Sequence, residues 1–202
     1  IFAIELKDNI LYGPYGIRFL PTTGSIIEEM RAMKFALLLL VFYAAEIIAR
    51  ERTSNIQALI YSTPVKNAIL WGSKCLTLAI LVMVLVTANI AIGIAVQLFN
   101  GYSHIELLKY SSLYYYSAFP LFLFIILIVF IQNLANNKYL GMMLSMIVVF
   151  AFSFAPKLGI EHFLLRFAAV PDLQFSYFNN FGYYANAFNW YMLYWLGFAI
   201  IL

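Results

Sequence analysis

Charged side chains are scarce in this chain of 202 residues, at 10% of the sequence against 64% hydrophobic residues. Soluble domains carry about a quarter charged residues and about half apolar ones. A soluble fold of this composition could not cover its surface with polar groups, so an ordinary globular enzyme is excluded. A disordered chain is excluded as well, because disorder requires low hydrophobicity and high net charge.

Residues that build disulfides, metal centres and nucleotide sites are equally few. Cys75 is the single cysteine, which excludes an internal disulfide framework and a multi-thiolate metal site. The sequence contains neither a Gly-x-x-x-x-Gly-Lys-Ser/Thr phosphate-binding loop nor a His-Glu-x-x-His zinc motif. His104 and His162 each stand near a glutamate; we interpret them as surface residues, with an external metal or proton site as the alternative. We therefore predict no catalytic, cofactor-binding or metal site in this chain.

Long uncharged runs take the place of such motifs and predict an all-α integral membrane protein. A helix needs about 20 mostly apolar residues to cross ~30 Å of hydrocarbon. Nucleic acid is not an expected partner, because the net charge of +3 is small and dispersed. The predicted spans cover residues 30–49, 69–99, 110–132, 139–155 and 188–202, the last incomplete.

The segments outside the spans differ in character. Residues 1–30 are rich in glycine and proline, which predicts an external loop segment ahead of a transmembrane domain over 31–202. Residues 156–187 are dense in aromatic side chains and asparagine, and they form either an interfacial belt or short re-entrant helices. Because the chain starts at Ile1 and stops within an apolar run, we expect it to be a piece of a longer protein.

Basic residues are distributed unevenly between the two sides of the predicted spans. One side, formed by 46–74 and 133–138, carries five Lys or Arg and two Glu, a balance of +3. The other side, formed by 1–34, 100–109 and 156–187, carries seven basic and seven acidic residues, a balance of 0. The positive-inside rule places the first side in the cytoplasm.

The stretch 50–68 between the first two spans is interpreted as a short cytoplasmic elbow. Its first residues are charged and mark the exit from the membrane, an apolar stripe at helical spacing follows, and a proline suits the first turn of the next helix. These residues are Arg50, Glu51, Arg52, Ile56, Leu59, Ile60, Ser62 and Pro64. The elbow is either a plain interfacial hairpin or a docking element for a cytoplasmic partner.

The order of residues around this elbow resembles that of type-2 ATP-binding-cassette (ABC) permeases. The matching residues are Glu46, Arg50, Glu51, Arg52, Ser62, Pro64, Gly72 and Lys74. The resemblance implies that the five spans are the second to sixth of a six-span half. It also implies that the elbow is the coupling helix that docks on an ATPase subunit. The coupling residues would be Glu46, Arg50, Glu51, Arg52, Ile56, Leu59, Ser62 and Pro64.

The same resemblance implies the rest of the assembly. The chain would be the permease subunit of an ABC transporter, an exporter of the bacterial inner membrane, in contact with membrane lipids. ATP and Mg²⁺ would be bound by separate ATPase subunits, and this chain would carry no cofactor of its own. A second permease half, either a copy or a homologous half, would complete the pathway.

Motifs in the second half are similar to those of one bacterial branch, in which a type-2 permease is fused to a C-terminal zinc aminopeptidase. These motifs are Asn136-Asn137-Lys138-Tyr139-Leu140-Gly141, Gly159-Ile160-Glu161-His162, Pro171-Asp172 and Asn180-Phe181-Gly182-Tyr183. A peptidase site would lie outside this chain, which lacks the zinc motif. The alternative function is therefore a membrane anchor or assembly domain of a larger protein, such as a membrane-tethered zinc aminopeptidase.

Polar residues within the predicted spans are few. An ion-coupled carrier would require charged groups at the midplane or broken helices, and the sequence indicates neither. Asn89, near the middle of its span, is the candidate for the transport pathway, with a hydrogen bond between helices as the simpler interpretation. Glu46 lies one turn before Arg50, and an i, i+4 ion pair is the simplest role for it.

Overall fold

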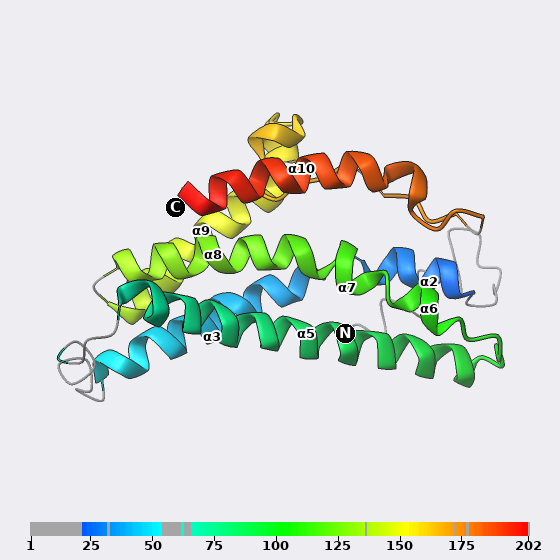
Figure 1. The fold of residues 1–202 in the computed structure, drawn as a ribbon, viewed down its shortest axis with the longest axis horizontal. Coiled ribbons are helices and arrows are strands. Elements are labelled where there is room, and N and C mark those ends of the chain that lie inside the picture. Colours follow the sequence, from blue (N-terminus) through cyan, green and yellow to red (C-terminus); the bar gives the residue numbers. More distant parts are fainter. Residues whose placement is uncertain are drawn as a thin grey trace.

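The computed structural model describes residues 22–31, 33–53, 62, 66–135, 137–171, 173–176 and 178–201. Within these residues the fold is helical, and strand pairing is limited to one isolated bridge between Ser176 and Asn180. The prediction of an all-α membrane protein is confirmed (Figure 1). The elements are α2 Thr23–Met30, α3 Lys34–Thr53, α5 Asn67–Phe99, α6 Leu107–Tyr110, α7 Leu113–Tyr116, α8 Ala118–Leu134, α9 Lys138–Phe154, η2 Ala155–Leu158, η3 Phe163–Leu165 and α10 Gly182–Ile201.

Helix α8 lies at the centre of the bundle and packs against α3, α5, α9 and α10. The continuous helical stretch Leu107–Leu134, which contains α8, has 56% of its most apolar window buried, against 22% for α5 and for α9. The outer helices therefore bury one stripe and leave the other faces apolar and exposed. Such faces are expected of helices that contact lipid.

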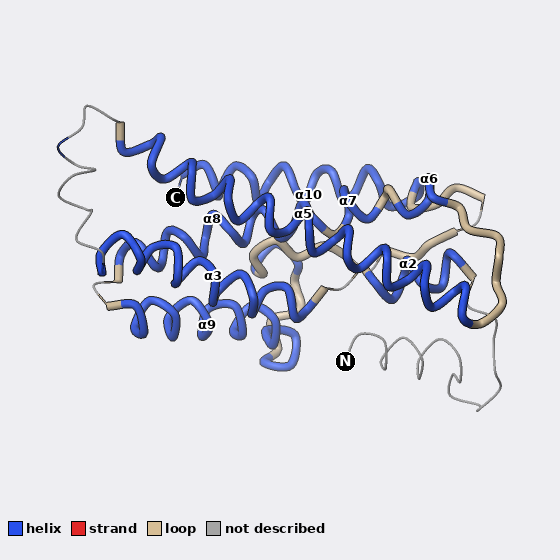
Figure 2. Tube along the Cα trace, turned by 90° about the horizontal axis from the view of Figure 1, so that it is seen from below, coloured by secondary structure: helices blue, strands red, loops and turns tan. Residues whose placement is uncertain are grey.

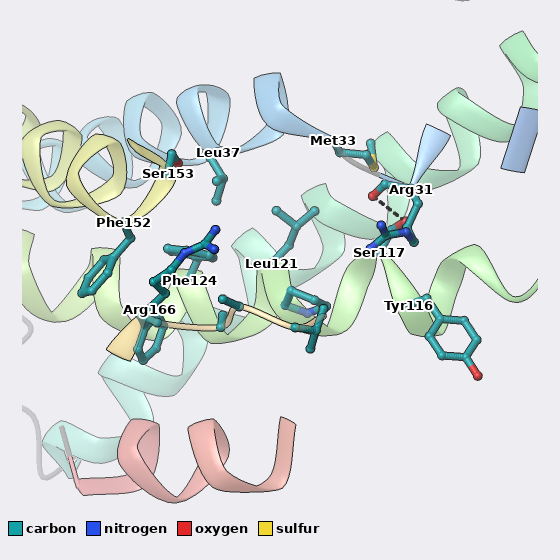
Figure 3. Close-up of a pocket in the computed structure, with 15 residues that line it drawn as sticks. Arg31, Met33, Leu37, Tyr116, Ser117, Leu121, Phe124, Phe152, Ser153 and Arg166 are labelled. Atoms are coloured by element: carbon teal, nitrogen blue, oxygen red, sulfur yellow. Dashed lines mark hydrogen bonds between the residues drawn. The ribbon is translucent and has the colours of Figure 1, made fainter. Parts of the chain in front are cut away.

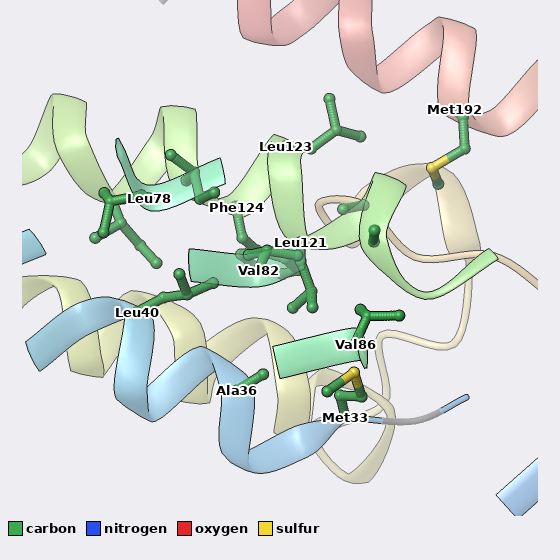
Figure 4. Packing of buried hydrophobic residues seen from close by; sticks show 14 of the residues in the cluster. Met33, Ala36, Leu40, Leu78, Val82, Val86, Leu121, Leu123, Phe124 and Met192 are labelled. Carbon is green, nitrogen blue, oxygen red and sulfur yellow. The ribbon is translucent and has the colours of Figure 1, made fainter. Parts of the chain in front are cut away.

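Helix α5 shows this division most clearly. Its buried residues follow one face at helical spacing: Leu78, Val82, Val86, Asn89, Gly93 and Gln97. The aliphatic first half of this stripe meets Leu40 of α3 and Leu121 of α8 in the apolar core (Figure 4). Leu76, Ile80 and Val84, on other faces, are each more than half exposed. At 1.5 Å per residue, the 33 residues of α5 extend about 50 Å, well beyond the ~30 Å of a hydrocarbon core.

Three helical stretches of the described residues are long and apolar enough to cross a membrane: Asn67–Phe99, Leu107–Leu134 and Lys138–Lys157. A fourth results if Thr23–Met30 and Phe35–Glu51, bent by 44°, form one broken span. Taken alone, α3 does not count as a membrane-crossing helix, because it contains too many charged residues. The last predicted span starts earlier than expected, at Gly182, and its asparagines and tyrosines lower its hydropathy.

The expectation of a loop throughout residues 1–30 is wrong for Thr23–Met30, which form the helix α2. Residues 1–21 lie outside the described residues. Ile26, Ile27 and Met30 of α2 are almost completely buried, and α2 packs on the second half of α5. Gly93 allows this approach, since a Cβ atom there would lie 2.7 Å from Met30 Sδ. The helix is therefore stabilised by tertiary packing that its own sequence does not reveal.

The aromatic segment that precedes α10 folds back onto the bundle. Phe167 packs its ring against Phe124 of α8 and Trp195 of α10, with centroids 5.4 and 5.2 Å apart. Phe181, just ahead of Gly182, packs its ring on that of Tyr116 with centroids 4.7 Å apart, and α10 begins at the glycine. These contacts explain why α10 begins six residues before the predicted residue 188.

Candidate functional site

The charged residues of the sequence motif gather at one end of the bundle. Helix α3 ends there, α5 begins there, and α8 and α9 are joined there, as both views show at their left side (Figures 1 and 2). This end, which we call the charged end, carries Glu46, Arg50 and Glu51 of α3, Lys74 of α5 and Lys138 of α9. The long elbow connection, most of it outside the described residues, leaves from this end.

An ion pair joins the two helices that flank the elbow. Lys74 Nζ lies 2.7 Å from Glu51 Oε2, and the two side chains are 12% and 36% exposed. Exposed ion pairs contribute about 0–1 kcal/mol. The partial burial of Lys74 raises the cost of losing its partner, because an ammonium group withdrawn from water needs a compensating charge. The pair therefore links the end of α3 to the start of α5.

A second ion pair joins α3 to α9. Lys138 Nζ donates to Glu46 Oε2, although Lys138 stands at the first residue of α9, where the helix dipole disfavours a cation. Glu46 offsets that effect by placing a carboxylate beside the helix start. The structure thus pairs Glu46 across helices, whereas the sequence suggested Arg50 as its simplest partner. Arg50 itself is exposed one turn further along α3.

The remaining coupling candidates are described only in part. Arg52 belongs to the last turn of α3, and Ser62 is exposed. Ile56, Leu59 and Pro64 lie outside the described residues. Their role in coupling, like that of Glu46, Arg50, Glu51, Arg52 and Ser62, stays a prediction.

Asn89 faces the break between α2 and α3. Its side chain is 4% exposed, and Nδ2 donates a hydrogen bond to the Met30 carbonyl at 3.2 Å. Ser117, just before α8, donates to the Arg31 carbonyl at 3.0 Å. Both carbonyls lie at the break between α2 and α3, and the Arg31 carbonyl also accepts from the Met33 backbone N–H at 3.2 Å. Side chains of neighbouring helices thus help to satisfy backbone groups at the break, as a bent membrane helix requires. This is the kind of interhelical contact that the simpler interpretation of Asn89 expects, while its place in a transport pathway stays a prediction.

Further out on α5, buried polar groups continue the same stripe. Gln97 is fully buried; its Nε2 donates to Thr23 Oγ1 at 3.1 Å, and its Oε1 accepts from the Tyr110 hydroxyl at 2.8 Å. Side-chain hydrogen bonds therefore join α2, α5 and α6 at the end of the bundle opposite the charged end. The recurrence of Asn89, Gly93 and Gln97 at intervals of four residues is the sequence signal for this contact.

The histidines do not come together. His162 accepts a hydrogen bond from the Leu164 backbone N–H and caps the turn η3, while His104 accepts one from Thr23 through its carbonyl. Among the described residues no three His, Cys, Asp or Glu side chains could hold a metal ion. The ionic partnerships of Lys74 and Lys138 were missed because pairing between distant helices has no local pattern. Their opposite charge to Glu46 and Glu51 on the same predicted side of the membrane was the available signal.

An apolar helical bundle with lipid-type outer faces, one charged end and a bent helix pair defines a multi-pass membrane protein. The family model described as ABC-2 family transporter protein matches residues 21–153, about two thirds of the chain. The chain belongs to this family and is a permease component of an ABC transporter, whose usual partner is an ABC ATPase subunit. No curated protein and no solved structure matches the chain.

Proposed function

We propose that this permease couples ATP hydrolysis in separate ABC ATPase subunits to export of a substrate across the bacterial inner membrane. ATP and Mg²⁺ would be bound by those subunits, and the elbow at 50–68 would dock on them. The observation that carries the proposal is the pair of ionic contacts at the charged end. Because Glu51–Lys74 and Glu46–Lys138 tie α3 to α5 and α9, a displacement of the elbow would act on three helices together.

The orientation rests on the charge balance of +3 against 0 and remains part of the proposal. Export rests on the resemblance to type-2 exporters. Attachment of a zinc aminopeptidase rests on the motifs of the second half. The family match ends at residue 153 and does not reach most of them.

We propose further that two permease halves form the complete pathway. Exposed apolar surfaces on α5, around Ile80 and Val84, and on α9, around Met143 and Ile147, suit contact with a second half or with lipid. Cross-linking of the purified, active complex followed by mass measurement tests this. An active complex with a single six-span set would rule the second half out.

The coupling role is tested by placing charge on the apolar stripe of the elbow. Ile56→Asp together with Leu59→Asp should abolish stimulation of the ATPase and weaken retention of the ATPase subunit. The reason is the loss of apolar burial worth about 1.5–3 kcal/mol per side chain. The measurement is ATP hydrolysis by the co-purified complex in nanodiscs, beside the amount of ATPase that remains bound.

The matched control makes the same two changes at Leu107 and Leu108 of α6, at the opposite end, where these side chains are 66% and 88% exposed. This control should keep the ATPase and its stimulation. If the elbow variant folds, retains the ATPase and stimulates it normally, the elbow is not the coupling element.

A further inference from the structure

A cavity of about 270 Å³ lies between the outer segment and the helices, away from the charged end. It is bounded by the break between α2 and α3, the first turns of α8, the last turn of α9 and residues 166–170 (Figure 3). Small-molecule sites usually enclose about 300–1,000 Å³, so this cavity lies just below that range and suits a small headgroup. The cavity lies beside the first turns of α8 and the last turn of α9.

Two arginines line this cavity from different segments. Arg31 follows α2, and Arg166 follows η3; in Figure 3 the Arg166 side chain rises from its segment toward Leu37, and Arg31 lies on the other side of Leu121. Guanidinium groups remain charged at any physiological pH and bind phosphate or carboxylate through paired hydrogen bonds. Their positive charge favours an anionic ligand over a neutral or cationic one.

Arg166 has a hydrogen-bond donor that is not used. Its Nε is buried and has no hydrogen-bond partner in the part of the chain that the structure describes, and no described carboxylate forms an ion pair with it. The guanidinium carbon lies 5.9 Å from the centre of the Phe163 ring, a contact that engages its face and leaves its N–H groups available. Asp172 lies outside the described residues and is included in the test below.

The remaining wall of the cavity is mainly apolar. Leu37, Leu121 and Phe152 line it together with Phe167, whose ring is fixed between Phe124 and Trp195. Ser117 and Ser153 add neutral hydroxyl groups to the lining. A ligand that satisfied both surfaces would therefore combine an anionic group with an apolar chain.

We propose that this cavity binds the anionic headgroup of an amphiphile, a phosphate or carboxylate group carried on an apolar chain. Arg166 and Arg31 bind the headgroup, and the chain follows the apolar wall toward the surrounding lipid. Binding itself is independent of the coupling mechanism proposed above. Identification of the amphiphile as transported cargo rests on that proposed function.

Photolabelling of the full chain, in complex with its ATPase and without ATP, tests the binding. The probe is dodecyl phosphate with a diazirine in the chain, and the matched probe is the zwitterionic dodecylphosphocholine with the same diazirine. The complex is held in phosphatidylcholine nanodiscs, and mass spectrometry locates the cross-linked peptides. We expect the phosphate probe to label the peptides around residues 117–124 and 152–153 at least about tenfold more than the phosphocholine probe. Equal labelling by both probes would show a merely apolar groove and overturn the proposal.

Variants assign the effect to the arginines. Arg166→Gln should lower labelling of the cavity peptides at least about tenfold, and Arg166→Lys should lower it less, because it keeps the charge and loses the paired geometry. Lys157→Gln is the matched control: Lys157 is a cation of the same outer segment that lies over the Phe154 ring and does not line the cavity. An equal loss with Lys157→Gln, or no loss with Arg166→Gln, would refute the proposal. Arg31→Gln provides a second variant if Arg166→Gln does not fold.

Two further arms identify competing partners. With Asp172→Asn, labelling should be unchanged or stronger; a loss as large as that of Arg166→Gln would make Arg166 a structural partner of that carboxylate and refute the proposal. Nanodiscs that contain phosphatidylglycerol separate the sources of the ligand. Suppressed labelling in them identifies a membrane lipid as the occupant, and unchanged labelling identifies a distinct amphiphile; both support the same anionic chemistry. Loss of ATPase coupling with intact labelling would count against the proposed function alone.

Discussion

Replacing Gly93 with alanine places a methyl group where α2 rests on α5. The new Cβ would lie 2.7 Å from Met30 Sδ, 3.0 Å from Ile26 Cγ2 and 3.1 Å from Met30 Cε. Both neighbours are almost fully buried, at 1% and 0% exposure, so they have little free space into which to move. The close approach of α2 therefore depends on the missing side chain at this position.

Two effects of opposite sign decide the outcome. Alanine gains about 0.5–1 kcal/mol over glycine within a helix, whereas overpacking of a filled core costs about 1–3 kcal/mol. We expect overpacking to prevail, with a net loss of about 1–2 kcal/mol, because the flexible tail of Met30 can relieve only part of the clash. An apparent melting temperature in nanodiscs should fall by about 2–4 °C per kcal/mol.

Gly72 on the same helix provides the control. A Cβ there would have no neighbouring atom within 4 Å. Gly72→Ala should therefore gain only the higher helix propensity of alanine, and the melting temperature should rise. Met30→Ala should partly rescue Gly93→Ala, because it removes the atoms closest to the new methyl group, and the double variant should be less destabilised than the two single changes predict. If Gly93→Ala melts as high as Gly72→Ala, α2 does not press on α5 as described.

Three more predictions concern an ion pair, a strained backbone position and a buried hydrogen bond. Glu51→Gln and Lys74→Met, measured singly and together, should show a coupling energy of about 1 kcal/mol in chemical unfolding that falls at high salt; additive effects would contradict the ion pair. Ala168→Gly should raise the melting temperature by an amount equivalent to as much as about 1 kcal/mol, because Ala168 has a φ of 54°, a left-handed conformation that strains an L-residue. Asn89→Leu should destabilise the fold by about 1–3 kcal/mol through loss of the donor to the Met30 carbonyl, and an unchanged melting temperature would argue against that hydrogen bond.

The extent of the long helices could be predicted closely from the sequence. The uncharged run after Lys74 predicts a helix over 69–99 and α5 covers Asn67–Phe99; the prediction over 139–155 compares with Lys138–Phe154 for α9. Both succeed because an uninterrupted apolar run of this length has few alternatives to a helix in a lipid environment.

The elements outside these runs could not be predicted in the same way. α2 is only eight residues long and would be marginal in isolation; it exists through the complementary surface around Gly93. The start of α10 at Gly182 depends on the packing of Phe181 and Phe188 against Tyr116, at ring separations of 4.7 and 4.9 Å. Such pairs bring together residues more than sixty positions apart, and a local pattern holds no information about them.

The candidate site was predictable in its composition and not in its contacts. The motif around Glu46 and Glu51 marked one end of the bundle, but it did not reveal that Lys138 and Lys74 provide their ionic partners. In the sequence, Arg31 and Arg166 are two of the seven basic residues on the side predicted to be external, and nothing distinguishes them from the others. Only the fold brings them to one cavity, because the break after α2 and the folded-back segment after η3 meet beside α8.

The unbroken length of α5 has a mechanical consequence. A helix of 33 residues held by an ion pair near its first turns behaves as a stiff lever. Lys74 and Phe99 are about 38 Å apart along the helix, so a tilt of about 5° at Lys74 would displace the Phe99 end by about 3 Å. Such a shift is comparable to the width of a small side chain. A small rotation at the charged end of α5 would thus produce a larger displacement at its other end, where α2, α6 and α7 pack against it.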